Sequence, residues 1–328
     1  MVDWGNTTVL LTGGTGSFGQ RMAARLWRMG AGRVVVYSRD ELKQHEMRQR
    51  HPDGPGSPAR YFIGDIRDRD RLMMALRGVD VVIHAAALKQ VVASEYNPFE
   101  AIKTNVLGAQ NLIEAAIERG VQKVIALSTD KAVNPVNLYG ATKLCAEKLF
   151  QSGNAYAGGG VTRFSVVRYG NVVGSRGSVV PFFRAKRETG KIPITDPRMT
   201  RFWITLDEAV DLVLRALETM RGGEIYVPKI PSIRVVDLAE AIAPGCRQEI
   251  VGIRPGEKLH ETLISEEEAR HAVDAGDHYL ILPEAWWAER GWDGEALPEG
   301  FRYSSDTNDR WLSVEELREM TEGAHALV

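Results

Sequence analysis

Short apolar runs alternate with helical patterns through the first half of the chain. The runs predict strands at 8–11, 33–37, 61–63, 79–87, 122–127 and 161–168. One of the helices between them begins at Asn97-Pro98 and is predicted to run on to about Arg119. Strands that alternate with helices predict an α/β fold with a doubly wound parallel sheet. Ligands of such a sheet bind beyond the carboxyl ends of its strands.

The pattern changes after residue 175. Prolines break the chain into shorter elements, among them helices near 206–220 and 234–242. We therefore divide the chain into a doubly wound domain of residues 1–175 and a mixed α/β lobe of residues 176–328, some segments of which return to the first domain. The tail holds Trp286, Trp287 and Trp292, which we predict to lie in the core of the lobe.

Composition narrows the class of protein. The 328 residues are 44% apolar and 26% charged with a net charge of −2, which argues against a surface for nucleic acid. No apolar run approaches the ~18 residues that span a bilayer, and the N-terminus lacks a signal-peptide pattern. We therefore expect a cytoplasmic protein with no membrane segment. Cys145, Cys246 and the histidines lack metal-ligand spacing, so no metal is assigned.

A glycine-rich turn joins the first strand to the first helix. Gly14, Gly16 and Gly19 fit the spacing G-x-G-x-x-G, and Gly13, Gly16 and Gly19 fit G-x-x-G-x-x-G. Glycines let such a turn close and let backbone N–H groups approach a pyrophosphate at the helix N-terminus. This context predicts a dinucleotide site of the Rossmann type. The residues predicted to form it are Gly13, Thr15, Gly16, Ser17, Phe18 and Gly19.

The end of the second strand indicates which dinucleotide is bound. An acidic residue there would bind the ribose hydroxyls of NAD, whereas an arginine would pair with the 2′-phosphate of NADP. Ser38 and Arg39 come first, and Lys43 follows one helical turn later, so we predict NADP. Asp40 leaves NAD open, although it also suits a helix N-cap.

The next two strands end in further candidate cofactor residues. Asp65, which precedes Ile66, either reaches the adenine or caps the helix predicted at 69–77. Ala85 and Ala86 are small enough to let the cofactor pass close to the backbone. Lys89 follows them, and we predict that it meets a cofactor phosphate or the substrate.

Two features lie outside these strand ends. Asn105 falls in the middle of a predicted helix, where it is a mediocre helix former, and we expect it to brace neighbouring backbone. Arg198, Arg201 and Arg254 lie in predicted loops of the lobe. Arginines in loops that face a cleft suit a diphosphate, and otherwise they are ordinary surface charge.

The stretch 127–143, L-S-T-D-K-A-V-N-P-V-N-L-Y-G-A-T-K, holds the candidate chemistry. Tyr139 and Lys143 are four residues apart and therefore share one face of a helix. An ammonium beside a phenol lowers the pKa of the phenol, so the pair is predicted to act as a general base near neutral pH. A turn is predicted at Asn134-Pro135. The other candidate catalytic residues end the fifth strand and are Thr129, Asp130 and Lys131.

Several blocks of this sequence are similar to one family. S-R-D-E-L-K, H-A-A-A-L-K, the 127–143 stretch, R-Y-G-N-V-V-G-S, R-M-T-R-F-W-I and R-P-G-E-K-L-H-E resemble extended short-chain dehydrogenases/reductases, and in particular the UDP-N-acetylglucosamine (UDP-GlcNAc) 4,6-dehydratases that invert C5. The resemblance covers residues 7 to about 317. It implies a hydro-lyase that takes UDP-GlcNAc, uses NADP, forms a homo-oligomer (a dimer or a larger ring) and opens pseudaminic acid biosynthesis.

The resemblance also implies roles for the residues. Tyr139, its pKa lowered by Lys143, would take the 4-hydroxyl proton while hydride leaves to NADP⁺, and Thr129 would bond the same oxygen. Asp130 and Lys131 would then divide the acid and base roles. We favour Asp130 as the acid and Lys131, its pKa depressed by burial and cations, as the base, and the division stays open. The substrate-binding residues implied are Lys89, Thr104, Lys131, Asn171, Val180, Met199, Arg254 and Glu257.

Two other functions stay open. A UDP-hexosamine 4-epimerase would share the fold, the cofactor and Tyr139, but it needs no acid for a C6 hydroxyl, so Asp130 and Lys131 favour the dehydratase. A non-catalytic NADP-binding sensor would not need Thr129, Tyr139 and Lys143 together.

Overall fold

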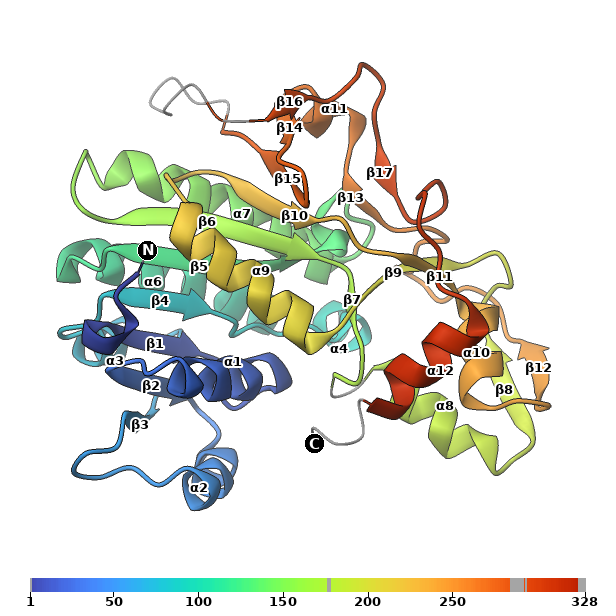
Figure 1. The fold of residues 1–328 in the computed structure, drawn as a ribbon, viewed down its shortest axis with the longest axis horizontal. Coiled ribbons are helices and arrows are strands. Elements are labelled where there is room, and N and C mark those ends of the chain that lie inside the picture. The colour runs from blue at the N-terminus through green and yellow to red at the C-terminus, as the bar shows by residue number, and fades with distance from the viewer. Residues whose placement is uncertain (1, 176–177, 284–291, 293, 324–328) are drawn as a thin grey trace.

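A ten-stranded sheet organises the protein (Figure 1). The computed structural model describes residues 2–175, 178–283, 292 and 294–323. From one edge to the other, the strands are β3 (Ala59–Ile63), β2 (Arg33–Ser38), β1 (Thr8–Thr12), β4 (Val81–His84), β5 (Lys123–Thr129), β6 (Arg163–Tyr169), β10 (Ile225–Pro228), β15 (His278–Ile281), β14 (Ala272–Asp274) and β16 (Glu295–Ala296). The strands from β3 to β10 pair in parallel. The other three extend the sheet in antiparallel fashion. The predicted α/β class with a doubly wound parallel sheet is confirmed.

Helices cover both faces of the parallel part of this sheet. On one face, α1 (Ser17–Arg28) packs against α9 (Leu206–Thr219). On the other, α6 (Gly108–Arg119) packs against α3 (Arg69–Ala75) and α7 (Leu138–Tyr156). Central strands covered on both sides are nearly continuous apolar runs, which is why their signal in the sequence is strong. The short helix η1 (Trp4–Asn6) precedes β1, and α2 (Glu41–Arg50) joins β2 to β3.

The helix predicted from Pro98 to about Arg119 is not continuous. It consists of α5 (Pro98–Ile102), a π-helical turn η2 (Lys103–Leu107) and α6, and α4 (Val91–Tyr96) precedes it. The Asn105 side chain accepts a hydrogen bond from the N–H of Leu88 (2.8 Å) and donates one to the carbonyl of Leu88 (2.9 Å). The expected brace is therefore confirmed. The Asn105 side chain thus holds the loop that follows β4. π-Helical turns are frequent at functional sites.

The chain beyond β6 builds a second, smaller core beside the sheet (Figure 1). It includes Val180, Phe183, Trp203 and Ile233. The remaining elements beyond β6 are β7 (Asn171–Val172), α8 (Val179–Arg187), β8 (Lys191–Ile194), β9 (Thr200–Ile204), β11 (Ser232–Arg234), α10 (Val235–Ile242), β12 (Arg247–Ile250), β13 (Thr262–Ile264), α11 (Glu266–Ala269), β17 (Tyr303–Ser304) and α12 (Val314–Gly323). The buried apolar residues of β13, α11 and β17 belong to the main core. The predicted domain boundary after residue 175 stays a prediction.

The tryptophan-rich tail is described only in part. Trp286 and Trp287 lie outside the described residues. Trp292 packs against the core of the main sheet, with the guanidinium of Arg221 4.6 Å from its ring centroid, and not in the smaller core where we expected it. In the described part of the chain, no helix combines the length and apolar character needed to cross a membrane.

Candidate active site

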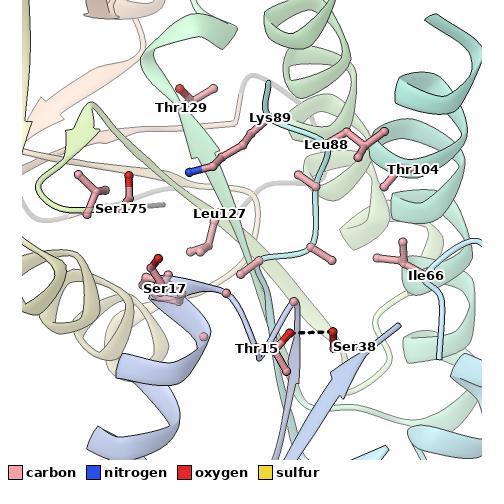
Figure 2. Close-up of a pocket in the computed structure, with 18 of the residues that line it drawn as sticks. Thr15, Ser17, Ser38, Ile66, Leu88, Lys89, Thr104, Leu127, Thr129 and Ser175 are labelled. Atoms are coloured by element: carbon pink, nitrogen blue, oxygen red, sulfur yellow. Dashed lines mark hydrogen bonds between the residues drawn. The ribbon is translucent and has the colours of Figure 1, made fainter. Parts of the chain in front are cut away.

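A cavity of about 570 Å³ lies at the carboxyl ends of the parallel strands. All the residues predicted to bind the cofactor line it: Gly13, Thr15, Gly16, Ser17, Phe18, Gly19, Ser38, Arg39, Asp40, Lys43, Asp65, Ile66, Ala85, Ala86, Lys89, Tyr139 and Lys143. Thr104, Thr129, Lys131 and Asn171 line the same cavity. Figure 2 shows the Lys89 amine between Thr129 and Leu127, above the turn that holds Thr15 and Ser17. The residues predicted to bind the dinucleotide therefore share one continuous space with part of the predicted substrate residues.

The glycine turn places an uncapped helix N-terminus in the wall of this cavity. Gly16 is the N-cap of α1 and makes no side-chain capping bond. Gly13 has a φ of +65°, and a Cβ added there would lie 2.8 Å from the backbone nitrogen of Ala86. A Cβ on Gly19 would lie 2.5 Å from the Cα of Gly14. Only glycine permits these approaches, and the exposed N-terminus suits a pyrophosphate, so these residues fit a dinucleotide.

A hydroxyl and two cations surround the end of β2. The Ser38 and Thr15 hydroxyls lie 2.8 Å apart (Figure 2). Asp40 caps α2 by accepting the N–H of Lys43 at 3.0 Å, so its alternative role as an N-cap is confirmed. The Arg39 side chain is more than half exposed, with a terminal nitrogen 3.7 Å from Asp65. This end of the cavity can meet an added phosphate with Ser38, Arg39 and Lys43.

Asp65 lines the cavity and does not cap the helix that follows it. The N-cap of α3 is Asp68, which accepts the N–H of Arg71 at 2.9 Å, so the alternative role of Asp65 as that cap is wrong. Asp65 instead accepts the backbone N–H of Arg67 at 3.0 Å. Burial opposes the charge of Asp65, but its hydrogen bonds with Arg67 outweigh burial and lower the pKa.

Helix α7 brings Tyr139 and Lys143 to the cavity wall. Asn134 has a φ of +44°, which makes the turn predicted at Asn134-Pro135. Asn137 then caps α7 by accepting the N–H of Gly140 at 2.8 Å. Tyr139 is 9% exposed, and the Lys143 amine donates to the Leu127 carbonyl at 2.6 Å.

The lowered pKa expected for Tyr139 is wrong. Burial raises the pKa of Tyr139 to about 12, although the charge of Lys131 and a hydrogen bond with Thr129 act to lower it. The predicted effect of Lys143 is missing because its amine is turned to the Leu127 carbonyl. Burial lowers the pKa of Lys143 itself to about 8, with Glu147 opposing the shift.

Lys131 lies between two buried carboxylates. Its amine is 3.0 Å from Asp130 Oδ1 and 3.1 Å from Glu261 Oε1, and these carboxylate residues are 1% and 2% exposed. Burial alone would lower the pKa of Lys131, but the two carboxylates outweigh it and raise the pKa above its usual value. The predicted depression of this pKa is therefore wrong. Glu261 comes from far along the chain, at the end of R-P-G-E-K-L-H-E, and sequence reasoning gave it no role.

Several predicted substrate residues lie outside the cavity wall. Val180 is buried in the smaller core, and the sulfur of buried Met199 accepts a hydrogen bond from Thr195 at 3.2 Å. Arg254 and Glu257 pair with each other at 3.6 Å. Asp130, a predicted catalytic residue, is 1% exposed and does not line the cavity. Residues that line the cavity and were not predicted are Tyr37, Gly64, Ala87, Leu88, Leu127, Ser128, Tyr169, Gly170, Val172, Ser175 and Leu206. Most of them adjoin the predicted strand ends, which is the signal that could have found them.

The loop arginines have different surroundings. Arg198 is exposed and pairs with Asp196, at 2.8 Å. Arg201 is mostly buried, with Nε 4.0 Å from Glu261 and a terminal nitrogen donating to the Thr200 carbonyl. Arg201 therefore belongs to the charged cluster around Lys131.

Known proteins resemble this chain over nearly its whole length. The sequence model of a family described as polysaccharide biosynthesis protein matches residues 9–283. A UDP-N-acetylglucosamine 4,6-dehydratase (inverting) from Campylobacter jejuni is 52% identical over 96% of this chain and 98% of its own length. A UDP-glucose 4-epimerase from Rickettsia akari is 42% identical over 95% of this chain and 94% of its own.

Solved structures agree with the sequence comparison. Pen from Bacillus thuringiensis superposes with a TM-score of 0.91 at 37% identity, covering 100% of both chains. DesIV from Streptomyces venezuelae, a dTDP-glucose 4,6-dehydratase solved with NAD and TYD bound, has a TM-score of 0.69 at 25% identity, covering 77% of this chain and 87% of that one. The resemblance stated from the sequence is confirmed. The chain belongs to the polysaccharide biosynthesis protein family, with the fold of the extended short-chain dehydrogenases/reductases and high similarity to an inverting UDP-N-acetylglucosamine 4,6-dehydratase.

Proposed function

We propose that this protein is a UDP-GlcNAc 4,6-dehydratase that inverts C5, uses NADP and opens pseudaminic acid biosynthesis. The observation that carries the proposal is the charged cluster of Asp130, Lys131 and Glu261, of which Lys131 lines the same cavity as Thr129, Tyr139 and the predicted dinucleotide residues. A proton donor and a proton acceptor next to the redox pair are what the loss of water requires. The 52% identical relative named as an inverting dehydratase supports the proposal.

Tyr139 and Thr129 act first. Gly16, Ser38 and Arg39 would help to hold NADP, which when bound would supply the hydride acceptor for C4 and the hydride donor for C6. Tyr139 takes the proton of the 4-hydroxyl, and Thr129 holds the same oxygen. Because burial raises the pKa of Tyr139 to about 12, its role requires positive charge near the phenol, and the charge of Lys131 acts in that direction. The resulting C4 ketone makes the C5 hydrogen acidic.

Asp130 and Lys131 act second. A proton that passes from the Lys131 amine to Asp130 Oδ1, across their 3.0 Å hydrogen bond, turns the ion pair into a neutral amine and a carboxylic acid. The amine then takes the C5 proton, and the acid protonates the departing C6 hydroxyl, so that both groups return to their original charges. A proton from solvent then adds to C5 on the opposite face as the hydride reaches C6, which inverts C5, and Tyr139 releases to solvent the proton that it took from the 4-hydroxyl. The reverse division, with Asp130 as base and Lys131 as acid, needs no prior transfer, so the division of the two roles stays open.

A time course of NMR spectra with UDP-GlcNAc and NADP in deuterated water tests the reaction. We expect a 4-keto-6-deoxy product with deuterium at C5 and inverted C5 configuration. UDP-N-acetylgalactosamine as the only product would instead support the epimerase, the activity named for the Rickettsia relative. Binding of NADP without conversion of any nucleotide sugar would support the sensor.

Lys131→Met tests the base role separately. If Lys131 removes the C5 proton, exchange of that proton with solvent falls by about 10²-fold or more. Oxidation at C4 is expected to slow less than C5 exchange, because Tyr139 and Thr129 remain and only the Lys131 charge that lowers the pKa of Tyr139 is lost. The isotope effect of C4-deuterated substrate measures this oxidation. Unchanged C5 exchange in this variant would remove Lys131 from the base role.

The choice of NADP rests on Arg39 beside Ser38. Arg39→Ala removes a charged donor for the 2′-phosphate, so NADP affinity is expected to fall about tenfold or more while NAD affinity stays nearly constant. Titration calorimetry with both nucleotides measures the difference. Arg48→Ala is the matched control, because Arg48 lies on α2 but pairs with Asp53 and does not line the cavity. Equal losses of affinity for both nucleotides in Arg39→Ala would contradict the predicted preference for NADP.

The homo-oligomer stays a prediction.

A further inference from the structure

Glu261 reaches the charged cluster from the second half of the chain. It directly precedes β13, and its backbone is fixed by Ser305: the Glu261 N–H donates to the Ser305 hydroxyl at 2.9 Å, and the Ser305 N–H donates to the Glu261 carbonyl at 2.8 Å. The side chain is 2% exposed and does not line the cavity. Glu261 is therefore placed to act on Lys131 and not on a bound substrate.

Glu261 is shared by three cations. Its Oε1 lies 3.1 Å from the Lys131 amine and 4.0 Å from Arg201 Nε, and its Oε2 lies 3.8 Å from the Lys258 amine. The Lys258 amine also donates to the Val133 carbonyl, at 2.5 Å. Burial of a carboxylate costs desolvation free energy, and these three cations offset part of that cost.

The groups that face Lys131 come from several elements. Asp130 lies on the same turn, η3 (Asp130–Ala132), and Tyr139 lies on α7. Arg201 comes from β9, and Lys258 and Glu261 come from the segment before β13. Asp130 and Glu261 favour the charged form of Lys131, whereas Arg201 and Lys258 disfavour it.

We propose that Glu261 is a positioning residue for the elimination: its carboxylate holds the Lys131 amine at the cavity wall and determines the pH at which that amine can give up its proton to become a base. This inference rests on the proposed function. When Asp130 takes the proton from Lys131, Glu261 is the remaining carboxylate beside the amine. It is then the counterion for the ammonium that forms again when the C5 proton is removed.

Glu261→Gln tests this role because it keeps the shape of the side chain and removes its charge. Loss of a carboxylate about 3 Å from an ammonium makes the ammonium easier to deprotonate, by about one pH unit or more. We expect the rising limb of the pH profile for C5 proton exchange to move to lower pH by that amount. The same displacement is expected in the NMR titration of isotope-labelled Lys131 in the protein without substrate, a measurement that does not depend on activity.

Glu268→Gln is the matched control. Glu268 is also a carboxylate in an ion pair with a buried cation, Arg168, but it does not face Lys131. This variant is expected to leave both midpoints unchanged. A Glu261→Gln protein with unmoved midpoints, or a control that moves as far, would overturn the proposal.

Lys258→Gln tests the same contact in the opposite direction. It removes a cation that lies near Glu261 and Lys131. The midpoints of the C5 exchange profile and of the Lys131 titration are therefore expected to move to higher pH. This variant tests the proposal if Glu261→Gln does not fold. Unmoved midpoints in Lys258→Gln would count against the role of Glu261. The proposed function fails separately, if the unaltered protein with NADP makes no 4-keto-6-deoxy sugar from UDP-GlcNAc.

Discussion

Single buried side chains in this protein take their acid–base properties from neighbours in space. Tyr139, Lys131 and Lys143 each differ from the behaviour that their spacing in sequence predicts. His84, beneath the cavity at the end of β4, is a further case. It is 2% exposed, and its Nδ1 lies 2.7 Å from the Thr12 hydroxyl. Burial, aided by the charge of Lys143, lowers the pKa of His84 from 6.5 to about 3.

His84 should make the fold sensitive to mild acid. Because its pKa is depressed in the folded state, its contribution to stability is present above pH 6.5 and is lost as the pH falls toward about 3. At pH 5 the loss relative to pH 7 is about 2 kcal/mol. The measurement is urea unfolding of the protein and of His84→Gln at both pH values. The fall in unfolding free energy should be about 2 kcal/mol smaller in the variant. His45→Gln is the control, because His45 is exposed, and its unfolding free energy should fall between pH 7 and pH 5 as much as that of the unaltered protein. An equally large fall in His84→Gln would contradict the pKa assigned to His84.

At the scale of elements, α7 and the turn that carries Lys131 approach as closely as glycine allows. A Cβ on Gly140 would lie 2.1 Å from the Lys131 carbonyl oxygen. Tyr139 and Lys131 are therefore positioned by one backbone contact. The spacing of Tyr139 and Lys143 along the helix is visible in the sequence, whereas the contact of that helix with η3 is not.

Gly140→Ala should separate these two elements. The added methyl has no room, so α7 or η3 must shift, and turnover is expected to fall more than about tenfold because a misplacement of 1 Å costs that much or more. Dehydration of UDP-GlcNAc and binding of NADP are measured side by side. Gly153→Ala on the same helix is the control: its Cβ would meet only side chains, at 3.1 Å and beyond, which can adjust. Full activity in Gly140→Ala would show that this contact does not position the site.

At the scale of the whole molecule, one buried guanidinium links three parts of the chain. Arg168 on β6 is 0% exposed, 2.6 Å from Glu147 on α7 and 2.8 Å from Glu268 on α11. It also donates to the Leu263 carbonyl on β13, at 2.9 Å. The segment that carries Glu261 is thereby tied to the sheet.

Arg168→Leu should be strongly destabilising. It leaves two carboxylates without their buried cation, and the free energy of unfolding is expected to fall by about 3–5 kcal/mol. Urea denaturation measures the change. Arg69→Leu is a matched control, because Arg69 also bridges two glutamates, Glu114 and Glu118, but its side chain is 42% exposed, and a loss under about 1 kcal/mol is expected. Similar losses in both variants would contradict the argument from burial.

The sequence by itself determined the fold class, the strand ends to within about three residues and many of the residues that line the cavity. Doubly covered strands are apolar runs and the turns after them are rich in glycine, so this information is local. Only the tertiary structure decided which charges meet. Glu261 and Lys131 are far apart in sequence, and neither side chain signals its partner. The π turn at Asn105 depends in the same way on the Leu88 backbone. Charge and hydrogen bonding act through space, so the proton chemistry of the site follows from packing, whereas its location follows from the pattern of the chain.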